Sequence, residues 1–285
     1  MVDITTLDAD LARSEAQVRA LRPGCHKRVV WADAQAVKTP VALLYIHGFS
    51  ASPEETRPLP DLVAQSLKAN IYFTRLTGHG QDGAAMAQAS LADWERDVAE
   101  AVTIAQNIGE EIILMGCSTG CTLATLALAG GTKARAVIHI APNFGLTDRR
   151  AQWLLDMPGS QYWGHLLAGS TRSFVPINAA HAAYWTTRYP TKAVHPMGQA
   201  VRAVRRADLS AVKTPAYFAF NEADQVVCAK DTRAVMDRWG GPVTPDVLVQ
   251  GPDDDVSGHV MAGDVFSPKQ TEPLARRISE WLETI

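Results

Sequence analysis

The sequence predicts an α/β fold in which a mostly parallel central sheet is flanked by helices and carries an inserted helical cap. Three observations lead to this fold class. Short apolar runs bounded by turn residues recur along the chain, as expected of strands buried on both faces of a parallel sheet. Amphipathic helical patterns alternate with these runs. One segment of about sixty residues lacks any such run and interrupts the alternation.

Six apolar runs are predicted to be the strands. The first of them lies between Pro40, a turn signal, and the pair His47-Gly48. Apolar runs of this length with turn residues at both ends are typical of buried strands. In chain order the predicted strands are Val41–Ile46, Ile71–Leu76, Glu111–Gly116, Arg135–Ala141, Ala216–Phe220 and Asp246–Gln250.

Several helices have recognisable ends. Apolar residues recur every three or four positions between Ser90 and Gly109, which indicates one amphipathic helix. Ser90 and Asp93 are expected to cap its start reciprocally, and Gly109 to end it. The last helix is expected to start at Ser267 as its cap, with a proline in the first helical position. Residues 1–25 are predicted to form a helical extension with one apolar face.

The interrupting segment spans residues 143–204 and is predicted to be a cap or lid of short helices. The core domain then consists of residues 1–142 and 205–285. The segment is rich in aromatic residues and histidines. These side chains either form the small core of the cap itself or line a ligand pocket, since pockets are usually lined in this way. They are Trp153, Tyr162, Trp163, His165, His181, Tyr184, Trp185, Tyr189 and His195.

The composition excludes several classes of protein. The formal net charge is −3 and no run of lysine or arginine occurs, so we expect no nucleic-acid partner. No stretch has the length of a membrane span, and the acidic N-terminus lacks the apolar core of a signal peptide. The four cysteines are scattered without a framework spacing, which favours free thiols in a reducing cytoplasm. We therefore expect a cytoplasmic protein without integral membrane association.

The stretch MGCSTGCTLA, residues 115–124, contains a candidate nucleophile. Gly116-Cys117-Ser118-Thr119-Gly120 matches the pattern G-x-S-x-G, directly after a predicted strand and before a predicted helix. That pattern builds a sharp, strained turn that lifts the serine hydroxyl clear of the sheet. Cys117 and Cys121 have the spacing C-x-x-x-C, but no second pair lies nearby to complete a zinc site. We interpret both cysteines as packing residues and Ser118 as the nucleophile.

A serine hydroxyl needs a base to take its proton, and the base needs an acid to orient it. His259 follows the last predicted strand, where a loop reaches the edge of the sheet, and is the candidate base. Asp224 follows the strand Ala216–Phe220 and is the candidate acid. Glu222 is the alternative acid, which we interpret as a solvated loop residue. The chain order Ser118, Asp224, His259 is the order that this architecture uses.

Other titratable residues are given structural interpretations. His47 and His79 lie at ends of predicted strands and are weaker candidates for the base than His259. His139 lies within a predicted strand, which indicates a satisfied core residue. The acidic run Asp253–Asp255 precedes His259 and is interpreted as a solvated loop. Four arginines of the cap are either contacts for an anionic substrate or, as we favour, solvated charges. They are Arg149, Arg150, Arg172 and Arg188.

An oxyanion hole requires backbone N–H groups that point at the developing negative charge. The amide of Thr119 is one candidate, because it follows the nucleophile at the start of a helix, where N–H groups have no intrahelical acceptor. The amide of Phe49, in the loop after Val41–Ile46, is the other. Both assignments concern the backbone and do not depend on the side chain.

The chain resembles the α/β-hydrolase superfamily, and within it the carboxylesterase and monoacylglycerol-lipase-like group. The resemblance covers nearly the whole chain and rests on YIHGFSASPEE, LTGHGQDG, MGCSTGCTLA, FNEADQVV and SGHVMAGD, in that order. It implies a triad of Ser118, His259 and Asp224, an oxyanion hole built from the two amides named above, and neither cofactor nor metal. His79 matches the family's G-H-G position, which implies a structural role.

The sequence therefore predicts a serine hydrolase that acts on a small-molecule carboxylic ester through an acyl-enzyme. Two alternatives stay open. The same triad serves thioesterases, amidases, C–C hydrolases and acyltransferases. A non-catalytic binding protein can also use this fold, although the three residues of the triad are all present.

Overall fold

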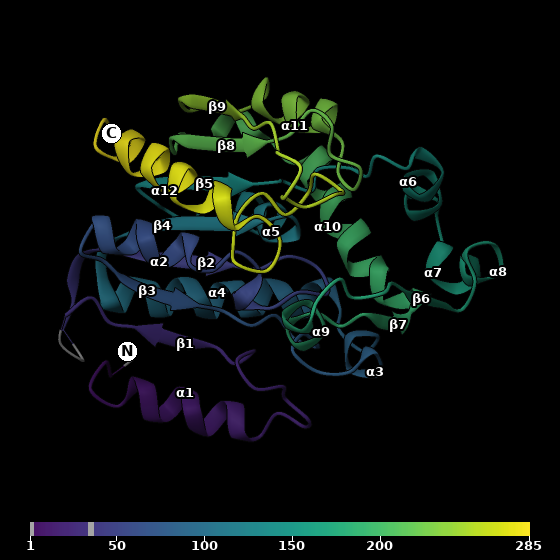
Figure 1. Cartoon of the computed structure of the whole chain (residues 1–285), viewed down its shortest axis with the longest axis horizontal. Helices are drawn as coiled ribbons and strands as arrows, with labels where there is room; N and C mark the ends of the chain where they lie inside the picture. The colour runs from purple at the N-terminus through teal and green to yellow at the C-terminus, as the bar shows by residue number, and fades with distance from the viewer. Residues whose placement is uncertain (1–2, 34–36) are drawn as a thin grey trace.

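The computed structural model describes residues 3–33 and 37–285. A seven-stranded sheet in the order β1-β3-β2-β4-β5-β8-β9 runs through it (Figure 1). β1 pairs antiparallel with β3, and every other neighbouring pair is parallel. The predicted fold class is thus confirmed. The strands are β1 (Arg28–Val30), β2 (Thr39–Ile46), β3 (Asn70–Phe73), β4 (Gly109–Cys117), β5 (Ala136–Ile140), β8 (Ala216–Phe220) and β9 (Val243–Val247).

β3 ends at Phe73, three residues before the end of the predicted run Ile71–Leu76, and the two strands at the edges of the sheet differ further from the prediction. β9 begins and ends three residues before the predicted run Asp246–Gln250, and β1 was not predicted at all. Both strands pair on one side only and are half-buried or exposed along much of their length. An edge strand therefore needs no continuous apolar run, and the pattern that identifies central strands is weak there.

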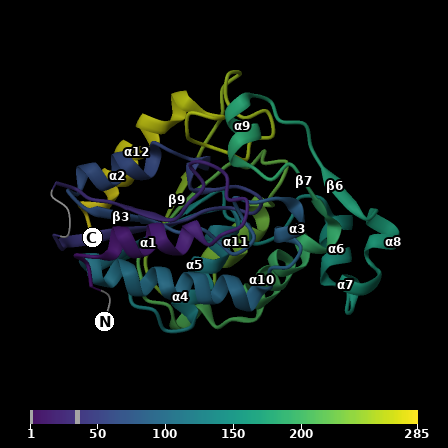
Figure 2. The same ribbon diagram turned by 90° about the horizontal axis from the view of Figure 1, so that it is seen from below.

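Helices cover both faces of the sheet, and β2 shows how one strand serves both. Val41, Leu43 and Tyr45 pack into the apolar cluster that includes α2 and α12, whereas Ala42, Leu44 and Ile46 pack into the cluster of α4, α5 and α10. Figure 2 shows α2 and α12 on one side of the sheet and α4 and α10 on the other. Alternate side chains of a strand point to opposite faces, so a strand buried on both sides is apolar throughout. The core helices are α1 (Leu7–Ala16), α2 (Leu59–Ser66), α3 (Gly83–Met86), α4 (Leu91–Ile108), α5 (Thr119–Ala129), α11 (Ala229–Met236) and α12 (Pro268–Leu282). α10 (His195–Arg206) begins in the inserted segment and ends in the core.

The predicted ends of α4 and the predicted start of α12 are confirmed, whereas α1 differs. Ser90 and Asp93 form a complete capping box, and Gly109 is the C-cap of α4. Ser267 precedes Pro268 as predicted, but its side chain does not cap α12; the hydroxyl donates to the carbonyl of Val260 instead (2.6 Å). α1 is shorter than the predicted extension over residues 1–25, because it ends at Ala16.

The inserted segment contains a small sheet that was not predicted. β6 (Thr171–Ser173) and β7 (Arg188–Pro190) pair antiparallel, with Arg172 opposite Tyr189. Each strand has only three residues and neither is apolar, so no hydrophobic run marks them. The segment protrudes beside the core (Figure 1). Its helices are α6 (Arg149–Asp156), α7 (Ser160–Trp163), α8 (His165–Ala168) and α9 (Ala179–Tyr184).

The helix α10 joins the inserted segment to the core. It begins within the predicted range 143–204, and it packs against α5 on one side and α6 on the other. Its buried face includes Met197, Val201 and Val204. We propose residues 143–204 as the cap, with α10 as the helix on which the cap rests.

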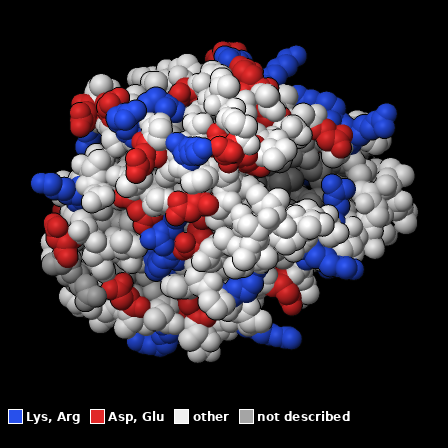
Figure 3. Space-filling view, in the orientation of Figure 1, with Lys and Arg blue, Asp and Glu red and all other residues white. Residues whose placement is uncertain are grey.

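The surface shows no concentration of one charge on the face drawn in Figure 3, where acidic and basic side chains are interspersed. The same view shows a hollow between the core and the protruding segment. Within the described part of the chain, we find no helix of the length and apolarity that a bilayer crossing requires.

Candidate active site

Ser118 occupies a strained turn between β4 and α5. Its backbone has φ 51° and ψ −113°, a conformation that non-glycine residues seldom adopt. Two flanking glycines permit it. A Cβ on Gly116 would lie 2.6 Å from the amide nitrogen of Cys121, and one on Gly120 would lie 1.9 Å from the carbonyl oxygen of Ile46. The G-x-S-x-G pattern is therefore required by close backbone contacts at this turn.

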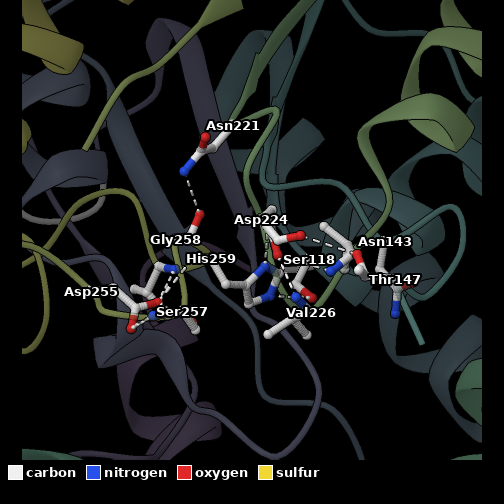
Figure 4. A network of polar contacts seen from close by, with 12 residues as sticks. Ser118, Asn143, Thr147, Asn221, Asp224, Val226, Asp255, Ser257, Gly258 and His259 are labelled. Atoms are coloured by element: carbon white, nitrogen blue, oxygen red, sulfur yellow. Dashed lines mark hydrogen bonds and ion pairs between the residues drawn. The ribbon is translucent and has the colours of Figure 1, made fainter.

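The three side chains predicted as nucleophile, base and acid form one hydrogen-bonded row (Figure 4). The Nε2 atom of His259 lies 3.1 Å from the Oγ atom of Ser118, and its Nδ1 atom lies 2.8 Å from Oδ2 of Asp224. They come from three separate loops, at the ends of β4, β8 and β9. Because the carboxyl ends of parallel strands share one edge of the sheet, residues far apart in sequence meet there.

Asp224 is held by its own loop. Its Oδ1 atom accepts hydrogen bonds from the amides of Val226 (2.7 Å) and Val227 (2.9 Å), which leaves Oδ2 for the imidazole. Glu222 points elsewhere and pairs with Arg233 at the surface. The structure therefore brings Asp224 to the imidazole, and not the alternative acid.

The environment of His259 suits a base. Burial acts to lower the pKa of its imidazole, but the negative charge and hydrogen bond of Asp224, with smaller contributions from Asp255 and Glu55, outweigh burial and raise that pKa. A proton on Nδ1 is directed at Asp224, so the Nε2 lone pair faces the hydroxyl of Ser118. That is the tautomer that can accept the serine proton.

The loop that carries His259 is organised by Asp255. Its carboxylate accepts hydrogen bonds from the amides of Ser257 (3.2 Å), His259 (3.0 Å) and Val260 (2.8 Å), and from the hydroxyl of Ser257 (2.6 Å). The interpretation of this residue as a solvated loop acid is therefore wrong. Four converging hydrogen bonds keep the backbone of His259 in place (Figure 4).

The other two acids of the run have different environments. Asp254 is buried and accepts hydrogen bonds from the amide of Gly251 (2.7 Å) and the side chain of Gln270 (2.9 Å), so its interpretation as a solvated acid is also wrong. Asp253 is exposed and pairs with Lys269 (2.5 Å), as a solvated loop acid would. Three identical neighbours thus have three environments, which their sequence does not distinguish.

The loop after β2 brings the Gly48-Phe49 peptide beside Ser118. A Cβ on Gly48 would lie 3.2 Å from the Cβ of Ser118. The Nε2 atom of His47 accepts from the amide of Leu76 (3.0 Å), so Nδ1 carries the proton and donates to the carbonyl of Gly48 (2.9 Å). Burial lowers the pKa of His47 to about 4, which keeps it neutral and structural.

A buried carboxyl that sequence analysis missed lies in the same loop. The Oε1 atom of Glu55 accepts hydrogen bonds from the amide of Gly48 (2.6 Å) and the hydroxyl of Tyr45 (2.9 Å). Glu55 is 3% exposed, whereas its neighbour Glu54 pairs with Arg28 and Arg57. The string SASPEE contains two adjacent acids, and no signal in it separates the buried one from the partly exposed one.

Comparisons with known proteins agree with this architecture. A model of the alpha/beta hydrolase family matches residues 43–275. A thermostable monoacylglycerol lipase from Bacillus sp. (strain H-257) is 34% identical over 90 residues, which are 32% of this chain and 35% of that protein. The aligned region thus spans about a third of that relative's length.

Solved structures of lipolytic enzymes have the same fold. One solved structure comes from work on two metagenome-derived lipolytic enzymes, LipS and LipT. It superimposes with a TM-score of 0.72 at 19% identity, over 93% of this chain and 100% of that chain. A soluble variant of monoglyceride lipase from Saccharomyces cerevisiae superimposes with a TM-score of 0.66 at 13% identity, over 91% of this chain and 90% of that chain.

The chain belongs to the alpha/beta hydrolase family. The family match extends from within β2 into α12 and so includes Ser118, Asp224 and His259. The likeness to the solved structures, at less than a fifth identity, concerns the fold.

Two further histidines of this alpha/beta hydrolase are buried in aromatic surroundings. His79 packs against His47, Phe49 and Trp94, and its burial lowers its pKa well below the usual value. His139 packs among aromatic rings of the core, and burial lowers its pKa to about 3. His139 is a core residue as expected, but neither ring nitrogen has a hydrogen-bond partner within the described residues.

The two cysteines near the nucleophile are buried and free. The thiol of Cys121 donates to the carbonyls of Gly116 (3.0 Å) and Ile140 (3.3 Å), and burial raises the pKa of both thiols well above the usual value. Residues 3–33 and 37–285 contain no group of three or more His, Cys, Asp and Glu side chains placed to hold a metal ion. These surroundings support the packing interpretation.

The aromatic residues of the cap fall into two groups. Some form a small core: the ring of His181 stacks on Phe174 and meets Trp185 and Phe266 edge to face. Tyr189 of β7 instead contacts Phe49, beside the nucleophile. Other apolar side chains of the cap are largely exposed, namely Trp153, Tyr162, Leu166, Leu167, Val175 and Ile177.

Proposed function

We propose that this protein is a serine hydrolase that cleaves carboxylic esters through an acyl-enzyme intermediate. The observation that carries the proposal is the row of contacts at 3.1 Å and 2.8 Å that joins Ser118, His259 and Asp224. A serine hydroxyl is inert at neutral pH unless a positioned base accepts its proton. The row supplies that base, with its tautomer set by a buried carboxylate.

The proposed reaction begins when Oγ of Ser118 attacks the ester carbonyl carbon while Nε2 of His259 takes the hydroxyl proton. The carbonyl oxygen becomes an oxyanion in the tetrahedral intermediate. His259 then gives its proton to the departing alkoxide, which leaves as the alcohol. A water molecule, deprotonated by the same imidazole, attacks the acyl-enzyme, and the collapse of the second intermediate releases the acid and restores the serine.

The amides of Phe49 and Thr119 are proposed to bind the oxyanion. Phe49 follows Gly48, which packs against Ser118, and Thr119 is the first residue of α5. The hydrogen bonds found among the described residues include none from either amide, so both N–H groups are available to a ligand. Donors held in this way stabilise a transition state without reorganisation.

The substrate is proposed to be a small ester with an apolar acyl group. Two observations support this class: the partial sequence similarity to a monoacylglycerol lipase, and the apolar side chains that the cap presents. Arg149, one of the cap arginines considered for an anionic substrate, is paired with Asp231 (2.8 Å). We propose the cytoplasm as its compartment, because the four cysteines are free.

Hydrolysis of p-nitrophenyl esters from acetyl to long-chain acyl tests the proposal. We expect activity that peaks at one chain length, and a loss of kcat of about 10⁴–10⁶ in Ser118→Ala. A fluorophosphonate probe should label the wild-type protein and not the variant. An active Ser118→Ala protein would refute the role of the serine. A folded wild-type protein that neither turns over esters nor reacts with the probe would indicate a non-catalytic protein.

A further inference from the structure

Glu55 is a buried carboxyl that the row of Ser118, His259 and Asp224 does not use. It is the last residue of the short 3-10 helix Pro53–Glu55, in the loop that follows β2. None of the salt bridges among the described residues includes it, although it is almost completely buried. A buried carboxyl without a cationic partner is costly, because removal from water penalises its charged form. Its position therefore calls for a functional explanation.

Glu55 and His47 together hold the two peptide units that meet at Gly48. The Oε1 atom accepts the amide hydrogen of Gly48 (2.6 Å), and Nδ1 of His47 donates to the carbonyl of the same residue (2.9 Å). Gly48 is thus held at both ends. Because a peptide unit is planar and trans, a carbonyl of Gly48 turned toward His47 directs the amide of Phe49 to the opposite side.

The turn lies between Glu55 and the nucleophile. A Cβ on Gly48 would lie 2.9 Å from Oε2 of Glu55 and 3.2 Å from the Cβ of Ser118. Tyr45 extends the support, since its hydroxyl donates to Oε1 of Glu55 (2.9 Å) and accepts from Thr56 (2.6 Å). Gly48 therefore lies close to both the carboxyl of Glu55 and the side chain of Ser118.

Glu55 is also coupled to the base. Burial raises the pKa of Glu55 to about 7, while the hydrogen bonds of Gly48 and Tyr45, the charge of His259 and the thiol of Cys117 act to lower it. In turn, an ionised Glu55 raises the pKa of His259, in addition to Asp224 and Asp255. Groups that interact in this way release their protons as a pair, and not as two independent sites.

We propose that Glu55 is the positioning residue of the oxyanion hole, and that its charge sets the low-pH limit of the reaction jointly with His259. The inference rests on the proposed ester hydrolysis. Glu55 holds the amide of Gly48 while His47 holds its carbonyl, and together they aim the amide of Phe49 at the oxyanion. Through its charge, it stabilises the imidazolium that His259 becomes when Ser118 attacks.

Three variants test this inference. Glu55→Gln keeps an oxygen acceptor for Gly48 and Tyr45 but cannot ionise, and Glu55→Ala removes the acceptor as well. Glu54→Gln is the matched control, because Glu54 is the adjacent glutamate and pairs with Arg28 and Arg57 away from Ser118. For each protein, kcat and KM for a p-nitrophenyl ester are measured from pH 5 to pH 9, with the Ki of an alkylboronic acid as a transition-state analogue.

We expect Glu55→Ala to lose about 10²-fold in kcat/KM, mainly in kcat, with a parallel rise in the boronic acid Ki. Glu55→Gln should restore kcat to within about threefold of the wild-type plateau. Its acid limb should move to lower pH by about half a unit or more and follow a single ionisation. Glu54→Gln should keep the wild-type profile.

The outcomes separate the two proposals. Wild-type kcat and Ki in Glu55→Ala would overturn the positioning role, and an unmoved acid limb in Glu55→Gln would overturn the coupling to His259. If Glu55→Ala does not fold, Glu55→Gln tests the positioning role by itself. Because this variant keeps an acceptor for Gly48, a loss of about 10²-fold in its kcat would overturn the inference. Activity that survives in Ser118→Ala would instead refute the proposed function itself.

Discussion

Two loops reach Ser118, and each is organised by one carboxyl group. In the loop after β2, Glu55 binds the amide of Gly48. In the loop after β9, Asp255 binds the amides of His259 and two neighbouring residues. The first carboxyl accepts two hydrogen bonds and is buried, whereas the second accepts four and is partly exposed. In both loops a carboxyl group accepts hydrogen bonds from backbone amides, but one carboxyl is buried and the other is partly exposed.

The difference shows what burial does to a positioning group. Near solvent, a carboxylate that accepts several N–H hydrogen bonds exchanges part of its water shell for these donors, which stabilise its charged form. Glu55 receives one N–H and one O–H bond in the interior, so burial dominates and its pKa rises to about 7. The loop after β2 is thus supported by a group that changes charge near neutral pH.

The largest expected effect concerns Asp224, the carboxylate that contacts the imidazole directly. We expect Asp224→Asn to lower kcat by about 10⁴, because an amide in this place favours the wrong tautomer of His259. Glu222→Gln, at the surface ion pair with Arg233, is the control and should stay active. Steady-state kinetics on a p-nitrophenyl ester measure both. If Glu222→Gln caused the greater loss, Asp224 would not be the acid.

Asp255 should have an intermediate effect, since it acts on His259 through the backbone. Asp255→Ala leaves the amides of His259 and Val260 without their acceptor, and we expect a loss in kcat/KM of about 10–100-fold. The free energy of unfolding should fall by about 1–3 kcal/mol. Asp253→Ala, which removes an exposed ion pair with Lys269, should leave kcat/KM at the wild-type value. Equal activities of the two variants would show that the hydrogen bonds of Asp255 do not position the base.

The last effect concerns stability and not catalysis: the free energy of unfolding should depend on pH through Glu55. The pKa of Glu55 is raised from 4.5 to about 7. Between these two pH values, the carboxyl of Glu55 therefore stays protonated in the folded protein but is ionised in the unfolded chain. The contribution of Glu55 to stability is therefore greatest below pH 4.5 and is lost as the pH rises to about 7.

Urea unfolding of the wild-type protein and of Glu55→Gln at several pH values measures this dependence. We expect the variant to gain stability relative to the wild type between pH 4.5 and about 7, and the difference to be constant above that range. A difference that does not vary with pH would show that Glu55 titrates alike in the folded and unfolded chains.

Local patterns were sufficient for much of this molecule. The apolar runs predicted the central strands, because a strand buried on both faces has no polar positions to interrupt the run. Ser90, Asp93 and Gly109 predicted the ends of α4, since capping depends on residues within one turn. At Ser118, the neighbouring glycines indicated the strained turn that the structure contains.

Other features depended on contacts between distant segments. The pairing of β6 with β7 joins residues that carry no strand pattern, and β9 lies three residues before its predicted position at the open edge of the sheet. The side chain of Ser267 was expected to cap α12, but the carbonyl of Val260 competes for its hydroxyl. In each case the energy that decides the local conformation comes from a partner that local sequence does not specify.

The sequence by itself determined the nature of the site: a serine in a turn that only small neighbours permit, followed in order by an aspartate and a histidine at later strand ends. Only the tertiary structure decided which carboxyl groups support it. Glu54 and Glu55, or Asp253 and Asp255, are chemically identical residues close together in the sequence. One of each pair forms an ion pair with a basic side chain, while the other accepts hydrogen bonds from backbone amides. The physical reason is that a carboxyl takes its role from the donors and the water around it, and folding alone brings those donors together.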